Sequence, residues 1–173
     1  TIIAVICFLC VSSLYIQAQK INHASLLYTP QRIQQVKQRM QHEPKLQEAW
    51  GDIKKTADKA LQKKDFNRLD YLSLAYLMTD NKEYADAIKE ILLKAVEAES
   101  WGDVEMMARI PAWRSQLGMA HKSFLSAVGY DAAYNVMSSS ERKKIAEGLK
   151  RLAVEPALGD WLLEPTRIHS LNS

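Results

Sequence analysis

The sequence predicts an all-α protein built from antiparallel helix hairpins. Apolar residues recur at three- and four-residue spacing through nearly the whole chain after residue 19, which is the period of a helix face. No segment alternates apolar and polar residues long enough to indicate a strand. The connections between successive helices are short, and short connections favour antiparallel neighbours.

The first nineteen residues are expected to be an export signal rather than part of the fold. They carry no charged side chain, and Ala18 follows the apolar run as a small residue of the type found at cleavage sites. The run is closed by Gln17 and Lys20, short of the roughly 20 apolar residues that a membrane span needs. The missing initiator Met indicates a clipped N-terminus. We therefore expect residues 1–19 to be a signal peptide, residues 20–173 to fold, no stable membrane span, and a periplasmic or secreted location.

Composition excludes several function classes. Both cysteines, Cys7 and Cys10, lie inside the predicted signal, so the mature chain has no disulfide, thiolate metal site or cysteine nucleophile. The formal net charge is +3, and residues 20–64 carry ten Lys/Arg against four Asp/Glu. This excess permits a polyanionic ligand without specifying one.

The first two helices are predicted from caps and periodicity. Thr29 followed by Pro30 marks a helix start, and this helix is expected to stop near Glu43. The second helix is expected over residues 45–63, with a narrow alanine-rich buried stripe opposite its lysines. The predicted buried positions are Ile33, Val36, Met40, Leu46, Ala49, Ile53, Ala57 and Ala60.

A third and a fourth helix form a predicted hairpin. The third breaks at residues 79–81, whose short polar side chains favour a turn, and the fourth covers residues 82–98. Their predicted apolar positions are Leu69, Leu72, Ala75, Tyr76, Tyr84, Ile88, Ile91, Leu92 and Ala95.

The next segment is a predicted loop over residues 100–111, within which residues 104–110 could form a short helix. A fifth helix is expected over residues 112–128, ending at Gly129, which suits a left-handed C-cap. A brief helical or turn segment follows over residues 130–137. The predicted buried stripe of the fifth helix is Trp113, Leu117, Ala120, Phe124 and Val128.

Ser138 and Glu141 form a predicted capping box at the start of a sixth helix. Pro156 and Gly159 are expected to end it, and the pattern lapses into turn residues toward Ser173. Hairpins without a closing element are typical of part of a helical array.

The stretches LSLAYLMTDNKEYADAIKEIL (72–92) and LGMAHKSFLSAVGYDAAYNVMSSSERKKIAEGL (117–149) resemble the N-terminal helical domain of heparinase II/III-like polysaccharide lyases, a group related to alginate lyases. The opening LLYTPQRIQQVKQRM (26–40) is similar to the start of such lyases. The resemblance implies an incomplete (α/α) toroid, normally followed by more helices and a β-sandwich.

The resemblance also implies an activity, the β-elimination of acidic, uronate-containing polysaccharides of the glycosaminoglycan or alginate type. In that chemistry an Asn, His or Arg neutralises the uronate carboxyl, and a Tyr or His removes the adjacent proton. By the resemblance these catalytic residues lie beyond Ser173, so the chain alone is expected to be inactive. The expected partner is an acidic polysaccharide, not nucleic acid.

Five residues are candidates for substrate binding. Trp101 lies on a predicted loop where its ring could stack on a sugar, and Arg114 could bind a carboxylate. Arg167, His169 and Asn172 lie in a non-helical segment at the end of the chain. For each of them, core packing or ordinary surface polarity is the alternative reading, and the same alternatives apply to Trp113 and Arg109.

Other chemistry-bearing residues are assigned structural roles. His121 falls on the apolar side of the fifth helix and is expected to be a hydrogen-bonded core residue, whereas His23 and His42 are expected to be exposed. Tyr130, Asp131 and Tyr134 are expected to serve turn formation and helix packing. Metal, nucleotide and serine-hydrolase motifs are absent from the sequence, so no cofactor is expected.

Two other functions stay open. Residues 74–98 have the Ala, Tyr and Ala spacing of one tetratricopeptide repeat, although nothing similar recurs 34 residues after Tyr84, and at least three units are needed for an array. A non-catalytic glycan-binding protein of the cell envelope could also keep the toroid without the chemistry.

Overall fold

The computed structural model describes residues 23–110 and 112–163, and in these ranges every regular element is a helix. The helices are α2 (Pro30–Arg39), α3 (Pro44–Lys63), α4 (Leu69–Thr79), α5 (Lys82–Ala95), α6 (Val104–Met107), α7 (Leu117–Ala133), α8 (Ser139–Leu149) and α9 (Glu155–Leu158). The predicted all-α class is therefore confirmed. No helix among the described residues is long and apolar enough to cross a membrane. The predicted signal peptide lies outside the described residues.

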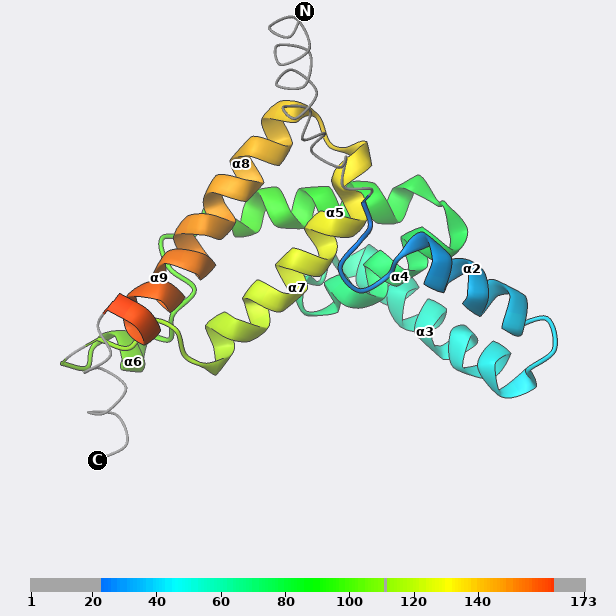
Figure 1. Ribbon diagram of the computed structural model, residues 1–173, viewed down its shortest axis with the longest axis horizontal. Coiled ribbons are helices and arrows are strands. Elements are labelled where there is room, and N and C mark those ends of the chain that lie inside the picture. Colours follow the sequence, from blue (N-terminus) through cyan, green and yellow to red (C-terminus); the bar gives the residue numbers. More distant parts are fainter. Residues whose placement is uncertain (1–22, 111, 164–173) are drawn as a thin grey trace, which may run out of the picture.

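Helices α4, α5 and α7 form the centre of the molecule. α4 packs against α3, α5 and α7, and α5 also packs against α7 (Figure 1). α4 is apolar on most sides, as expected of a helix surrounded by others. α2 and the first half of α3 extend away from this centre (Figure 1). This explains why Ala49, predicted to be buried, is exposed.

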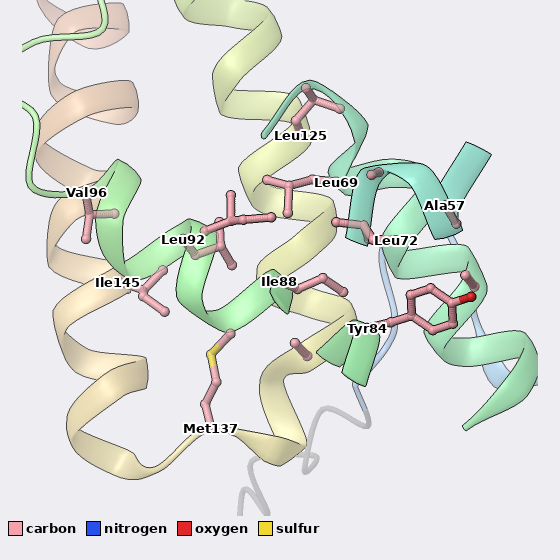
Figure 2. Packing of buried hydrophobic residues seen from close by; sticks show 14 of the residues in the cluster. Ala57, Leu69, Leu72, Tyr84, Ile88, Leu92, Val96, Leu125, Met137 and Ile145 are labelled. Carbon is pink, nitrogen blue, oxygen red and sulfur yellow. The ribbon is translucent and has the colours of Figure 1, made fainter. Parts of the chain in front are cut away.

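The hydrophobic core joins the central helices to α8. Its fully buried side chains include Leu69 and Leu72 of α4, Ile88 and Leu92 of α5, Leu125 of α7 and Ile145 of α8 (Figure 2). Each such side chain contributes about 1.5–3 kcal/mol relative to an exposed position.

The helix starts follow the predicted capping chemistry. The Thr29 hydroxyl accepts a hydrogen bond from the Arg32 N–H (3.3 Å), and Ser138 and Glu141 form the reciprocal capping box of α8. Asn81 caps α5 in the same way. The ends of α2 and α5 come a few residues earlier than predicted, in turns over residues 40–42 and 96–98.

The predicted bounds of the fifth helix are wrong at both ends. α7 begins only at Leu117, after a non-helical segment in which the backbone N–H groups of Arg114 and Ser115 bond to Asp160. It continues through Gly129, where a Cβ would lie 3.3 Å from both Ile88 and Leu69 side chains. Gly129 thus permits tight packing in mid-helix and is no C-cap.

The predicted buried face of this helix is also wrong in part. Of the predicted buried residues, Leu117, Ala120 and Phe124 are exposed and Val128 is buried. Met119 and Leu125, which were not predicted, are buried as well. Apolar residues lie on nearly every side of α7, so their spacing did not define the face that packs. His121 shares the exposed side and is not a core residue.

The last helix does not stop at Pro156 or Gly159 as predicted. α8 continues through a π-helical turn over Lys150–Val154, then α9, then a second π-helical turn over Gly159–Leu163. Pro156 sits in the first turn of α9, where the missing N–H of proline is tolerated. A Cβ at Gly148 would lie 2.3 Å from Val96 Cβ, so α8 approaches the end of α5 closer than alanine would allow.

Candidate functional site

Helices α3 and α5 end beside one pocket, and both ends carry lysines. Lys63 closes α3, Lys64 follows in the left-handed conformation (φ 48°), and Lys94 lies in the last turn of α5. Cations are favoured at these positions because the carbonyl end of a helix carries partial negative charge. The packing of α3 against α5 therefore gathers cations that are some 30 residues apart in the sequence.

The pocket has a volume of about 580 Å³. We call it the lysine pocket. Its lining residues come from the ends of α3 and α5, the segments that follow them, and the first half of α7: Lys63, Lys64, Phe66, Glu90, Ile91, Lys94, Ala95, Ala98, Ser100, Trp101 and Lys122.

The floor of the lysine pocket is apolar and partly aromatic. The rings of Phe66 and Trp101 meet edge to face with centroids 6.3 Å apart, and Ile91 packs nearby in the same core. Trp101 donates from Nε1 to the carbonyl of Ala95 (3.2 Å) and is only 4% exposed. Trp101 lies in a loop as predicted and lines the pocket, but its ring is anchored in the core and lacks the exposure expected of a residue that stacks on a sugar.

The rim of the lysine pocket is strongly positive. Four lysines face one carboxylate, that of Glu90, which lies 2.6 Å from Lys64 Nζ. Lys122 donates to the carbonyl of Trp101 (3.4 Å), while the side chains of Lys63 and Lys94 are exposed. With four positive charges and one negative charge, the pocket keeps three formal positive charges over an apolar floor, which suits an anionic ligand with an apolar face.

Arg114, the second predicted binding residue in the described ranges, holds a carboxylate of the protein itself. Its Nε and Nη2 donate to Asp160 Oδ1 (3.0 and 2.9 Å), and the backbone N–H groups of Arg114 and Ser115 donate to Oδ2 (both 2.8 Å). Burial would raise the pKa of Asp160, but these hydrogen bonds outweigh it and hold the pKa below its ordinary value. A Cβ at Gly159 would lie 2.4 Å from Arg114 Nη2, so glycine leaves room for the guanidinium.

A second buried carboxylate, Asp131 of α7, holds the segment that precedes α2. It accepts from the backbone N–H groups of Ser25 (2.7 Å) and Leu26 (2.8 Å), and His23 Nδ1 lies 2.6 Å from Oδ1. Burial alone would raise the pKa of Asp131, but the hydrogen bonds from Leu26, His23 and Ser25 lower it overall. The His23 ring also stacks on Tyr134 (centroids 3.8 Å apart), so His23 is not the exposed residue that was predicted.

Asp131 therefore does more than form a turn, and the sequence held a signal for it. Asp131 lies three residues after Val128 and six after Leu125, which places a carboxylate on the buried face of an apolar helix. A buried charge of this kind needs donors, and the preceding segment supplies them.

The remaining predicted residues lie elsewhere. Arg167, His169 and Asn172 lie outside the described residues. Trp113 is half-buried, Arg109 is exposed, and His42 is exposed as predicted. Across residues 23–110 and 112–163, no group of three or more His, Cys, Asp or Glu side chains is placed to hold a metal ion.

Comparison with known proteins assigns no family. The chain matches no protein-family model, no curated protein and no solved structure.

Proposed function

We propose that this chain is the N-terminal helical part of a secreted polysaccharide lyase, and that the lysine pocket binds its acidic, uronate-containing polysaccharide. The observation that carries the binding role is the group of four lysines around one apolar, aromatic-floored pocket. Ammonium groups bind carboxylate and sulfate as point charges, and the apolar floor supplies a surface for the face of a sugar ring.

The pocket is proposed as a binding site rather than the place of proton transfer. None of its lining residues is a histidine or a tyrosine, the residues expected to act as base and acid in β-elimination.

The proposal includes the larger (α/α) toroid, and exposed apolar side chains support it. Val104 of α6, Leu117 of α7 and Leu163 of the last helical turn are 83%, 84% and 77% exposed. α6, the beginning of α7 and the last helical turn lie toward the same end of the molecule, and α7 runs from there to the centre (Figure 1). Apolar side chains gathered at one end suit a surface that packs against further helices.

Binding is tested with a charge-matched pair of variants. In Lys63→Gln/Lys94→Gln, two exposed pocket lysines lose their charge, whereas Lys45→Gln/Lys55→Gln removes the same net charge from exposed positions of α3 outside the pocket. Calorimetric titration with chondroitin, heparin and alginate oligosaccharides is expected to show at least a tenfold loss of affinity in the pocket variant, since each charge-assisted hydrogen bond is worth about 1.5–3 kcal/mol. An equal loss of affinity in the two double variants would show that only the net charge of the protein matters, and would contradict a specific binding site.

Catalysis is tested separately on the longest soluble form of the protein. Incubation with heparin-, chondroitin- and alginate-type polysaccharides is expected to generate the ultraviolet absorbance of unsaturated sugar ends. Pocket-dependent binding without this absorbance would favour the non-catalytic glycan-binding protein, to which the same pocket observation applies. If neither polysaccharide binding nor the absorbance is found, the result would favour an interaction module based on the α4 and α5 hairpin.

A further inference from the structure

A second hollow adjoins the lysine pocket, and Ser100 lines both. Its volume is about 240 Å³. We call it the mixed-charge hollow, and its lining residues are Glu99, Ser100, Met107, Arg114, Arg151, Leu152, Glu155 and Pro156. The two hollows are therefore neighbours on either side of Ser100, close enough for successive units of one ligand to be considered.

The two arginines of the mixed-charge hollow already have partners in the protein. Arg114 is held by Asp160, as described above. Arg151 donates from Nη1 to the carbonyl of Glu99 (3.1 Å) and from Nη2 to the carbonyl of Val96 (2.9 Å). The N–H groups of both arginines are therefore used in hydrogen bonds within the protein. In this respect the hollow differs from the lysine pocket, where the side chains of Lys63 and Lys94 are exposed.

The carboxylates of the hollow are more available. Glu155 is exposed, and its ion pair with Lys150 is long (3.7 Å) and lies in solvent, where such pairs contribute little. Glu99 is also exposed. Together with Ser100, these side chains offer acceptors for hydroxyl groups next to the apolar surfaces of Met107, Leu152 and Pro156.

We propose that the mixed-charge hollow is a second sugar subsite, which takes an uncharged unit adjoining the acidic unit in the lysine pocket. This rests on the proposed function. The two glutamates and two arginines of the hollow cancel in formal charge, so it does not attract a second uronate as the four lysines do, and the carboxylates of Glu99 and Glu155 accept hydrogen bonds from sugar hydroxyls. The preferred ligand is then a polymer in which an acidic sugar adjoins an uncharged one, rather than one that is acidic at every unit.

The test compares ligand lengths in two matched variants. Glu155→Ala removes a carboxylate of the hollow (54% exposed), and Glu147→Ala removes a somewhat more exposed carboxylate of α8 (67%) with a similar weak pairing, to Lys143 at 3.9 Å. The probes are chondroitin disaccharide and tetrasaccharide, together with alginate dimer and tetramer, each titrated calorimetrically against the chain. General electrostatics predict that loss of either carboxylate tightens the binding of an acidic ligand, so a weakening in Glu155→Ala has the opposite sign.

In the unmodified chain, the chondroitin tetrasaccharide is expected to bind about tenfold more tightly than the disaccharide, a gain of about 1.4 kcal/mol. Glu155→Ala should lose most of this gain and keep its disaccharide affinity, while Glu147→Ala should keep both affinities. The alginate tetramer should bind only slightly more tightly than the alginate dimer.

Three outcomes separate this inference from the proposed function. Tetrasaccharide binding in Glu155→Ala that is as tight as in the unmodified chain would overturn the subsite, while lysine-dependent disaccharide binding would leave the lysine pocket standing. An alginate gain equal to that of chondroitin would overturn the preference for an uncharged unit. Failure of the unmodified chain to bind any of these probes or the heparin oligosaccharides would overturn both proposals.

Discussion

Asp131 and Asp160 anchor two different regions of the molecule through the same pattern of hydrogen bonds. Each is a buried carboxylate that accepts from two consecutive backbone N–H groups. These belong to residues 25 and 26 for Asp131 and to residues 114 and 115 for Asp160. The difference is the side chain that joins them, the ring of His23 in one case and the guanidinium of Arg114 in the other. The guanidinium binds Asp160 Oδ1 through two nitrogens, whereas the imidazole binds Asp131 Oδ1 through one.

The two anchors also differ in what they hold. Asp160 fixes the start of α7, a central helix, to the end of the last helix, whereas Asp131 fixes an edge segment to α7. Loss of the first should therefore disturb the core, and loss of the second should release a segment from a core that persists.

The largest expected effect comes from Asp160→Ala. It leaves the Arg114 guanidinium, whose side chain is 34% exposed, and two backbone N–H groups without their acceptor, and losing these charge-assisted hydrogen bonds together costs about 3 kcal/mol. Urea unfolding followed by tryptophan fluorescence measures this loss. A change below about 0.5 kcal/mol would show that the anchor contributes nothing to stability.

A smaller effect is expected for Asp131→Ala, about 2 kcal/mol, because two charge-assisted backbone hydrogen bonds are lost at the edge of the fold. Its distinctive result is local: the amides of Ser25 and Leu26 should exchange with deuterium much faster, while those of α4 and α5 stay protected. Unfolding of the whole chain at lower urea with uniform loss of protection would contradict the contrast between the two anchors.

The smallest effect is a pH dependence, which both anchors share. The pKa of each carboxyl is lower in the folded chain than its ordinary value of 3.8, so each contributes stability above that value. That stability is lost as pH falls through the lowered pKa. Urea midpoints between pH 7 and pH 3 should fall more steeply below about pH 4 in the unmodified chain than in Asp131→Asn or Asp160→Asn. Identical slopes in all three proteins would remove both carboxyls from the acid response.

The sequence predicted helices where one apolar face or a cap determines the structure. The stop at residues 79–81 and the capping box at Ser138 are local features, so they are readable without tertiary information. The bounds and buried face of α7 could not be predicted in this way. The helix is apolar on most sides, and the segment before it is held by a hydrogen bond from the Arg114 N–H to Asp160, 46 residues away.

The candidate site was less predictable than the fold. The excess of basic residues over positions 20–64 permitted an anionic ligand, but only the packing of α3 against α5 brings Lys63 and Lys94 to one pocket. Trp101 does lie in the predicted loop, but its burial could not be predicted, because its hydrogen bond to the carbonyl of Ala95 is not visible in the sequence.

The π-helical turn over Lys150–Val154 changes the direction in which all later side chains of this helix point. One extra residue in a helix rotates the later side chains by about 100° around the axis. Gly148, which precedes the turn, packs against the end of α5, while Asp160, twelve residues later, accepts a hydrogen bond from Arg114, in the segment that precedes α7. Spacing along this stretch is thus as constrained as residue identity, and a one-residue deletion within it would turn an otherwise intact Asp160 away from its partners.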